Sequence, residues 1–373
     1  MGPNDIISNQ NSRLNSLLSN GRVFTKFNYE TDIIENQKEI VTSPLFTDEQ
    51  TELSTYHTAS YQTTTQRKYY YDVVRSGSSL DCEFSIAYGN VNGGGSEIGS
   101  PQTIYPSKAI YKQYKQILLE PGNDLFKMND STTTEHVYII NFKRERFKQR
   151  LDPGNWQLTL SELNGGSHLN QNYTGSNVSV SGSNKLITLI DDSGDSAEYV
   201  SSLTDTGRVY NIVSGSISNG VYTSATQSYG LIYPEHGVII LNANVLDLNL
   251  SFNTVTGSNI NGENQLKLFK SLSGSAVING DSSMEGRASE IITSTYYYAR
   301  LKNTEYNFST NPSFTTGSLG DLRHLTMIQD PKVYITTIGL YNDSQELLAV
   351  GKISSPVLKS FSSEANIKVK IDW

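Results

Sequence analysis

The sequence predicts a mainly β fold: a β-rich body with a few short helices, an inserted small all-β domain and an extended N-terminal arm. Composition favours this class, because the chain contains 23 Tyr and 29 Gly against 4 Met and 1 Cys. Tyrosine packs well on pleated surfaces, whereas glycine makes turns. The clearest pattern is in Val333–Leu340 and Glu346–Ile353, two apolar-rich runs joined by an Asn-Asp turn, which is typical of a β-hairpin.

The final segment, Ala365–Trp373, alternates strictly between apolar and polar residues. One face carries Ile367, Val369, Ile371 and Trp373, and the other carries Lys368, Lys370 and Asp372. Alternation of this kind predicts a strand with one buried face. We therefore expect the chain to end on a core strand, with no catalytic tail after it.

Residues 1–78 are expected to form the arm. They are polar and rich in Thr, Tyr and Gln, apart from a short helix predicted around Leu14–Leu18 and closed at Gly21. Structureless spans of this length are unusual inside a compact domain. We expect the arm to become ordered against a neighbouring subunit; a loosely packed strand region of the same domain is the alternative.

Residues 79–155 together with 245–373 are expected to form the body. Leu80–Tyr88 alternates as a strand, the glycine triplet at 93–95 marks a loop, and Val137–Phe142 is a buried strand. The clearest helix is Lys108–Leu119, with Ser107 as its N-cap. Further elements are predicted as a short basic helix at Lys143–Leu151, a helix at Glu263–Leu272 and a Tyr-rich strand at Ser294–Leu301.

Residues 156–244 are expected to form the inserted domain. The turn Asp152–Asn155 predicts its boundary, and Trp156–Leu160 and Lys185–Ile190 predict strands. Ser218–Gly220 predicts a hairpin turn. Turn signals about every ten residues are typical of a small all-β unit.

Charge and hydropathy exclude several partners. The net charge of −8 argues against general nucleic-acid binding, because the chain has no domain-wide positive field. No run approaches the roughly 18 apolar residues of a membrane span, and the polar first 20 residues predict no secretory leader. The single Cys82 excludes an internal disulfide framework and favours assembly in a cytosol.

Motifs for catalysis are missing from the sequence, so we expect no enzyme, cofactor, metal ion or small-molecule substrate. The five histidines are scattered, and neither a Gly-X-Ser-X-Gly elbow nor a phosphate-binding glycine loop occurs. Sequence alone leaves open a Ser-His-Asp triad, or a pair of carboxylates as in a cell-wall glycosidase. The best metal candidate is the acidic segment Asp191–Glu198, which suits Ca²⁺; the favoured alternative is a solvated acidic turn.

Two features are candidate partner interfaces. The densest charge in the chain lies in residues 143–150, where the basic residues are Lys143, Arg144, Arg146, Lys148 and Arg150. This run either docks an acidic partner surface or is the solvated face of a helix with Phe147 turned inward. The triplets Tyr69-Tyr70-Tyr71 and Tyr296-Tyr297-Tyr298 place aromatic rings on both faces of a strand, which predicts either cover on both sides or an interface.

Several segments together resemble a known group of proteins. They are EFSIAYGN (83–90), YPSKAIYKQYKQILLEPGNDLF (105–126), HVYIINFKRERFKQRLDPGNWQLTLSEL (136–163), KLITLIDDSGD (185–195), YNIVSGSI (210–217), YGLIYPEHGVIILNA (229–243), ARLKNTEYNFSTNPSF (299–314) and the terminal hairpin. This series is similar to a virion structural protein of large contractile-tailed bacteriophages, especially those of marine cyanobacteria. The resemblance covers about Cys82 to Trp373.

The resemblance implies a non-enzymatic virion component, assembled in the host cytoplasm. It is expected in the tail or baseplate, as a wedge or fibre-attachment protein. Its implied partners are other virion proteins, including neighbouring copies in a ring. A neck or collar protein, or a receptor- or glycan-binding tail fibre module, is the alternative.

Overall fold

A computed structural model describes residues 27–53, 57–59, 69–75, 81–96, 105–128, 132–163, 185–194, 202–204, 207–217, 227–257, 264–279, 283–309, 312–316 and 321–373. The chain divides into two compact units. The larger unit is Ile40–Ile291, and the smaller unit joins Met1–Glu39 to Ile292–Trp373. Strands predominate over helices, so the prediction of a mainly β protein is confirmed.

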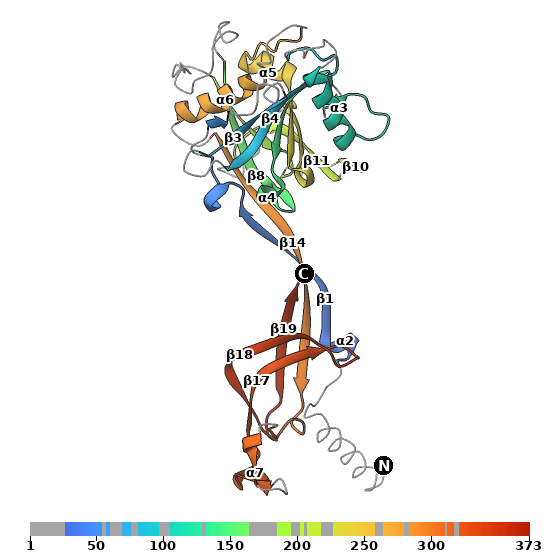
Figure 1. Cartoon of the computed structure of the whole chain (residues 1–373), viewed down its shortest axis with the longest axis vertical. Helices are drawn as coiled ribbons and strands as arrows, with labels where there is room; N and C mark the ends of the chain where they lie inside the picture. Colours follow the sequence, from blue (N-terminus) through green and yellow to red (C-terminus); the bar gives the residue numbers. More distant parts are fainter. Residues whose placement is uncertain are drawn as a thin grey trace. The chain divides into compact units, whose positions relative to one another are not determined.

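An antiparallel sheet forms the centre of the larger unit (Figure 1). Across the sheet its strands lie in the order β14-β8-β9-β11-β12-β13-β7-β4-β3-β2, and β10 pairs with β11. Their bounds are β2 His57–Ala59, β3 Tyr70–Val74, β4 Cys82–Asn90, β7 His136–Phe142, β8 Arg150–Ser161, β9 Leu186–Asp191, β10 Ser202–Thr204, β11 Gly207–Ser214, β12 Gly230–Tyr233, β13 Val238–Asn242 and β14 Met284–Leu301. The strands predicted at Val137–Phe142, Trp156–Leu160 and Lys185–Ile190 are confirmed.

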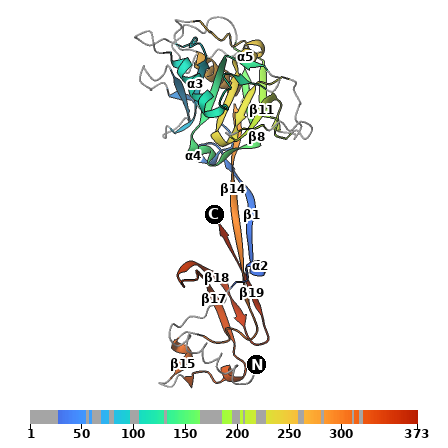
Figure 2. The same cartoon turned by 90° about the vertical axis from the view of Figure 1, so that its right-hand side faces the viewer.

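Helices cover both faces of this sheet (Figures 1 and 2). Helix α3 (Pro106–Leu118) lies on one face, and α5 (Ala243–Leu250) and α6 (Asn264–Asn279) lie on the other. Alternation along β7 shows this directly: Val137 and Ile139 pack in one core cluster with α3, whereas Tyr138 and Ile140 pack in the other with α5 and α6. Because successive side chains of a strand point to opposite faces, a strand covered on both sides is apolar throughout.

Shorter elements complete the larger unit. They are the 3₁₀ turns η1 (Thr47–Glu49) and η5 (Pro234–His236), the two-residue strands β5 (Phe126–Lys127) and β6 (Thr133–Thr134), and helix α4 (Arg144–Phe147). The predicted basic helix is therefore shorter than expected. It ends because Lys148 adopts φ 53° and ψ −94°, after which the chain enters β8.

Helix α3 begins two residues earlier than predicted, and Ser107 is not its N-cap. The N-cap position is Tyr105, whose side chain makes no capping hydrogen bond. The Ser107 hydroxyl instead donates to the carbonyl of Gly94 at 2.8 Å. Ser107 thus holds the glycine loop against the start of the helix.

The glycine loop lies tightly against another backbone segment. A Cβ on Gly94 would come within 1.7 Å of the Thr256 carbonyl oxygen. Gly95 has φ +78° and donates its N–H to the Gly257 carbonyl at 3.1 Å. Glycine is required here because two backbones approach more closely than any side chain allows.

The compact units differ from the expected domains. The Asp152–Asn155 segment lies inside strand β8, and β9, β11, β12 and β13 occupy the sheet between β8 and β7. Residues 156–244 are thus part of the main sheet, where hydrogen bonds to strands on both sides hold them. Within the expected arm, β3 is also an inner strand of that sheet, while residues 1–26 lie outside the described part of the chain.

The smaller unit contains the end of β14 and the last strands of the chain. Strand β19 (Ala365–Asp372) pairs with Ser294–Leu301 of β14, and β17 (Val333–Tyr341) pairs with β18 (Leu347–Lys359). The predicted terminal hairpin is therefore confirmed. Strand β1 (Ile33–Pro44) pairs with β14, and the remaining elements are α2 (Tyr29–Asp32), η6 (Pro312–Phe314), β15 (Thr315–Thr316), β16 (Asp321–Leu322) and α7 (Thr326–Gln329).

The last strand is not a core strand. Its alternation is present, but Ile367, Val369 and Ile371 are only half-buried. The side chain of Trp373 is 75% exposed. The apolar face that the sequence predicts exists, but the described residues of the smaller unit cover it incompletely.

Candidate functional site

The described residues of the smaller unit form very little apolar core. The buried apolar side chains among them are Tyr296, Leu340 and Ala365. The larger unit, in contrast, contains both core clusters found among the described residues. Because apolar burial is the main favourable contribution to folding, the described residues of the smaller unit contribute little stability through their own packing.

Large apolar side chains are instead concentrated on the surface of the smaller unit. Its described residues expose twelve of them: Tyr29, Ile34, Phe308, Leu325, Ile328, Tyr334, Leu347, Leu348, Val350, Leu358, Phe361 and Trp373. The described part of the larger unit exposes half as many, although it is the bigger body. Exposed apolar side chains indicate an interaction site where they form a contiguous patch, and not where they are scattered singly.

The densest group lies on the β17–β18 hairpin and is named here the hairpin patch: Tyr334, Leu347, Leu348, Val350 and Leu358. Tyr334 and Leu358 are directly opposite each other across the two strands. Leu348 and Val350 are two residues apart on β18, so they point to the same face, and they are 69% and 65% exposed. Val350 is opposite Gly339, which is five residues from Tyr334 on β17, so Tyr334 and Leu358 point to the other face. The hairpin thus exposes apolar side chains on both of its faces.

Each face of the hairpin also carries apolar side chains that are partly covered. On the face of Val350, Ile335 and Val357 are half-buried. On the face of Tyr334, Ile338 is half-buried and Leu340 is buried. A hairpin with two apolar faces resembles a strand pair from the middle of a protein rather than one from its surface. The exposed parts of both faces are therefore candidate contact surfaces.

Polar contacts hold the strands behind this hairpin together. The Tyr296 hydroxyl donates to Glu39 at 3.1 Å, and Lys370 Nζ donates to the same carboxylate at 3.0 Å. Lys370 also lies 3.2 Å from Asp372, and Lys368 Nζ lies 3.8 Å from the centre of the Tyr296 ring. The hydrogen bond from Lys370 lowers the pKa of Glu39, so this carboxylate stays ionised.

Lys359 is a buried cation at the end of β18. Its Nζ donates to the carbonyls of Asn303 and Ser360 at 3.1 and 3.0 Å, and to the side-chain oxygen of Asn307 at 3.1 Å. Burial lowers the pKa of Lys359, because its partners are neutral oxygens that replace water only in part. These bonds fix the loop after β14 to the end of the hairpin.

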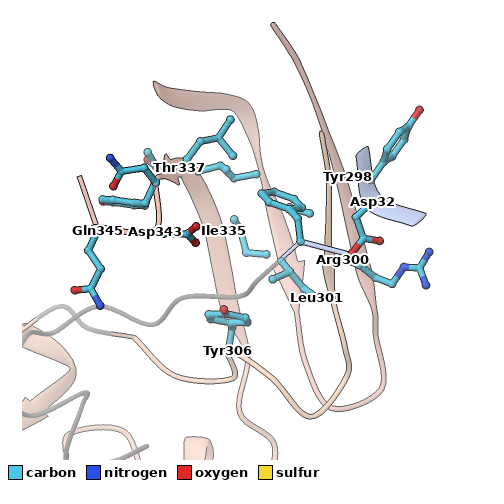
Figure 3. Close-up of a pocket in the computed structure, with 16 residues that line it drawn as sticks. Asp32, Tyr298, Arg300, Leu301, Tyr306, Ile335, Thr337, Asp343 and Gln345 are labelled. Carbon is cyan, nitrogen blue, oxygen red and sulfur yellow. The ribbon is translucent and has the colours of Figure 1, made fainter. Parts of the chain in front are cut away.

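A cavity of about 690 Å³ lies within the smaller unit. Figure 3 shows Leu301, Tyr306 and Ile335 near its centre, with Asp343 and Gln345 at one side and Asp32 and Arg300 at the other. Its walls come from α2, β14, β17 and the turn after β17. The lining combines aromatic rings with amide and carboxylate groups.

The basic residues of the 143–150 run all have partners inside the larger unit. Arg146 Nε lies 3.5 Å from Glu83, Lys148 lies 3.5 Å from Glu290, and Arg150 donates to Ser289 at 2.9 Å. Arg144 donates to the Glu235 carbonyl, and Lys143 lies 3.7 Å from Glu145. Phe147 is buried, as the solvated-face interpretation expects. Docking of an acidic partner by these residues stays a prediction.

The two tyrosine triplets are placed differently. Tyr71 is buried, and Tyr69 and Tyr70 are partly buried against the core cluster on the α3 face. Tyr296 is buried, while Tyr297 is half-buried and its ring centre is 5.6 Å from that of Phe27. Intramolecular packing therefore accounts for most of their ring surface.

The acidic segment at 191–194 shows local structural roles. The buried Asp191 accepts the N–H of Gly154 at 2.9 Å and that of Ser193 at 3.0 Å. Asp192 accepts the backbone and side-chain N–H groups of Asn211 at 3.0 and 2.9 Å. Burial raises the pKa of both carboxyls. Asp195–Glu198 lie outside the described residues, and within the described ranges no group of three His, Cys, Asp or Glu residues could hold a metal ion.

The thiol of Cys82 is buried and the imidazole of His136 is half-buried, and burial shifts the pKa of each toward its neutral form. Burial raises the pKa of Cys82 to about 11, so its sulfur is protonated at neutral pH. Burial lowers the pKa of His136, which lies near Asn244 and Asp247.

No helix in the described part of the chain is long and apolar enough to cross a bilayer.

Sequence reasoning did not identify the hairpin patch. One signal was available: Tyr334-Ile335 and Leu347-Leu348 place apolar residues at adjacent positions of a strand, hence on both faces. Such a strand is either covered on both sides or exposed on one.

Comparison with protein-family models gives no match, and comparisons with curated proteins and with solved structures give no significant match.

Proposed function

We propose that the chain is a structural component of a tailed-phage virion that acts through contacts between subunits. The observation that carries this proposal is the contrast between the two units: the larger has two complete core clusters, and the smaller exposes apolar side chains around a minimal core. A unit of that composition is stable when other subunits cover it. The resemblance to virion proteins of contractile-tailed phages is the reason for proposing that the assembly is a phage particle.

Under this proposal the larger unit is a rigid body, and the smaller unit makes the contacts. The tail or baseplate is the proposed location, as a wedge or fibre-attachment protein in a particle assembled in the host cytoplasm. Its partners are neighbouring copies and other virion proteins. Catalysis, nucleic-acid binding and a small-molecule substrate have no part in this role.

Purified particles of the virus that encodes the chain provide the test. We expect mass spectrometry to find the chain in particles at a copy number comparable to that of other tail proteins. Antibodies against the larger unit should label the tail or baseplate in electron micrographs. A chain that is abundant in the lysate but missing from particles purified on a density gradient would contradict the structural role.

The cavity of the smaller unit favours a second candidate, a glycan-binding fibre module. Sugar rings stack on aromatic side chains, and their hydroxyls bond to carboxylates and amides such as those of Asp343 and Gln345. A glycan array probed with the full chain tests this candidate. Binding that is lost in the Tyr306→Ala variant would support it, and an array without any signal above background would remove it.

A further inference from the structure

We propose that Lys359 and Asn307 become joined by an isopeptide bond, which the folded smaller unit forms between its own side chains. The bond connects the end of β18 to the loop after β14. This modification goes beyond the proposed structural role and does not depend on it, because the reaction needs only the two side chains and their immediate surroundings.

The amine and the amide are held together inside the unit. Lys359 Nζ lies 3.1 Å from Asn307 Oδ1, and Cγ, the electrophilic carbon of the carboxamide, is bonded to that oxygen. Lys359 is fully buried, and Asn307 is 9% exposed. A nucleophile fixed beside its electrophile reacts as though it were present at an effective concentration of about 10⁵ M or more. Aminolysis of an amide, which is very slow in free solution, thus becomes accessible to this pair.

Three oxygen atoms surround the amine. The carbonyls of Asn303 and Ser360 accept hydrogen bonds from Nζ at 3.1 and 3.0 Å, and Asn307 Oδ1 is the third acceptor. An ammonium group has three N–H donors, so its charged form satisfies all three. When one proton is lost, two N–H groups remain on the backbone carbonyls and the lone pair faces the Asn307 carboxamide. Burial lowers the pKa of Lys359, which makes the loss of that proton easier.

The loop after β14 holds Asn307 in place at a conformational cost. Tyr306, the residue before it, has φ 53°, in the left-handed region that residues other than glycine rarely adopt. Asn307 Nδ2 also donates to the Asn303 carbonyl at 2.7 Å. Both features keep the carboxamide beside the end of β18. The torsion about the Cβ–Cγ bond of asparagine is soft, so a rotation there turns the face of Cγ toward Nζ.

The reaction exchanges one amide for another. Glu305 takes a proton from the Lys359 ammonium, and the freed lone pair of Nζ attacks Asn307 Cγ, forming the Nζ–Cγ bond. The Cγ–Nδ2 bond breaks as Glu305 passes this proton to Nδ2, and Nζ gives up a second proton. The products are the isopeptide, which keeps one N–H, and ammonia, which leaves as ammonium with that second proton. No atom is oxidised or reduced, and no co-reactant is needed.

Glu305 is assigned as the proton carrier because of its charge and its place in the loop. The charges of Glu305 and Glu364 oppose the effect of burial and raise the pKa of Lys359, and Glu305 acts more strongly. Its carboxylate accepts the N–H of Lys302 at 3.3 Å, two residues before Asn307 in the same loop. Hydrogen bonds of proton carriers commonly tighten only in the reacting complex.

The intact mass of the denatured full chain tests the proposal. The reaction removes one ammonia, so we expect a mass about 17 Da below the value calculated from the sequence. Lys359→Ala and Asn307→Ala should each have the full mass calculated for the variant. Asn303→Ala is the matched control, because Asn303 contacts Nζ through its backbone carbonyl, and this variant should keep the deficit.

Digestion with trypsin locates the bond and separates it from loss of ammonia elsewhere in the chain. Trypsin does not cleave after an acylated lysine, so residues 303–323 should be recovered linked to residues 353–368, and fragmentation should place the link at Asn307 and Lys359. Lys267 is the internal control. It is also buried, but its Nζ donates to the backbone carbonyl of Asn253, so cleavage after it should be complete.

The role of Glu305 has its own test. Glu305→Gln should lower the fraction of linked chains at least about 10-fold in freshly purified protein, whereas Glu364→Gln should have a smaller effect. Wild-type conversion in Glu305→Gln would overturn the role assigned to this carboxylate.

The wild-type chain alone decides whether the bond exists. A wild-type mass equal to the calculated value, or recovery of residues 353–359 as a free peptide in place of the linked pair, would overturn the inference. Both measurements use the denatured wild-type chain, so neither depends on the folding of a variant. The presence or absence of the chain in purified particles tests the structural role separately, because an unlinked chain in particles removes only the bond.

Discussion

Arg146 Nε lies 3.5 Å from a carboxylate oxygen of Glu83, whose side chain is fully buried. The same carboxylate accepts the N–H of Thr47 at 3.2 Å and is bonded to the Thr47 hydroxyl. This pair joins α4, β4 and the η1 turn of the larger unit. One member of the basic run is thus mostly shielded from solvent by its contact with a buried carboxylate.

Removing one partner of this pair should be costly. Glu83→Ala leaves the guanidinium of Arg146 without its carboxylate in a site that is mostly shielded from water, so we expect a loss of about 3 kcal/mol in the free energy of unfolding. Urea unfolding followed by circular dichroism measures it. Lys148→Ala is the control, because its pair with Glu290 is exposed and should contribute less than about 1 kcal/mol. Equal effects of the two variants would contradict the buried role of Glu83.

The Tyr111 hydroxyl should contribute to stability through two backbone groups. It donates to the Thr134 carbonyl at 2.7 Å and accepts the Phe126 N–H at 3.2 Å. Phe126 and Thr134 are also partners in the β5–β6 ladder, so Tyr111→Phe removes one further hydrogen bond from each of two buried backbone groups. We expect a loss of about 2 kcal/mol in unfolding free energy. Tyr233→Phe is the control, because Tyr233 is also buried but no hydrogen bond contributes to its raised pKa, which burial alone causes. A loss as large for Tyr233→Phe would contradict this account.

The stability of the larger unit should fall as the pH drops below neutrality, in part because of His136. Burial lowers the pKa of His136 in the folded chain from its ordinary value of 6.5. Below pH 6.5 the unfolded chain takes up a proton that the folded chain still refuses, so acid favours unfolding. Thermal melts between pH 7.5 and 5.5 should show a decrease of the melting temperature.

Substitution isolates the contribution of this imidazole. His136→Gln keeps a polar side chain beside Asn244 and removes the titration, so the decrease between pH 7.5 and 5.5 should be smaller than in the wild type. The raised pKa values of Asp191 and Asp192 act in the opposite direction, because those carboxyls favour the folded chain at lower pH. They cancel in the comparison of variant with wild type. Identical pH dependence of the two proteins would show that His136 does not contribute.

The glycine loop should not tolerate a side chain at Gly94. In Gly94→Ala the new Cβ meets the Thr256 carbonyl, so one of two backbones must move, at a cost of about 1–3 kcal/mol or more. Gly351→Ala is the control, because a Cβ there meets no atom within 4 Å. Melting temperatures of the two variants check the prediction, and a wild-type value for Gly94→Ala would contradict the observed close approach.

The sequence predicted correctly those strands and turns that depend on residues close together in the chain. The apolar run Val137–Phe142 and the terminal hairpin follow from side-chain periodicity and turn residues, and both are present. The boundary expected at Asp152–Asn155 failed because a Pro-Gly pair can also be accommodated within a strand. The β8–β14 pairing shifts register between Gly286 and Ala288, opposite this segment, and that partner is more than 130 residues away in the sequence.

The candidate site depends on contacts that a sequence does not display. The hairpin patch was visible as an apolar strand pair, but whether a face is covered depends on which other elements pack there. The basic run was visible as a charge cluster, but Glu83 and Glu290, which compensate two of its members, come from distant parts of the chain. Long-range packing therefore decided both outcomes.

The two tryptophans of the chain fall one in each unit, and their surroundings are opposite. Trp156 is buried in the larger unit, whereas Trp373 is largely exposed in the smaller. An indole in an apolar interior emits at shorter wavelength than one in water, and a soluble quencher reaches only the second. Intrinsic fluorescence thus gives each unit its own optical reporter, and events in one can be followed separately from events in the other without any added label.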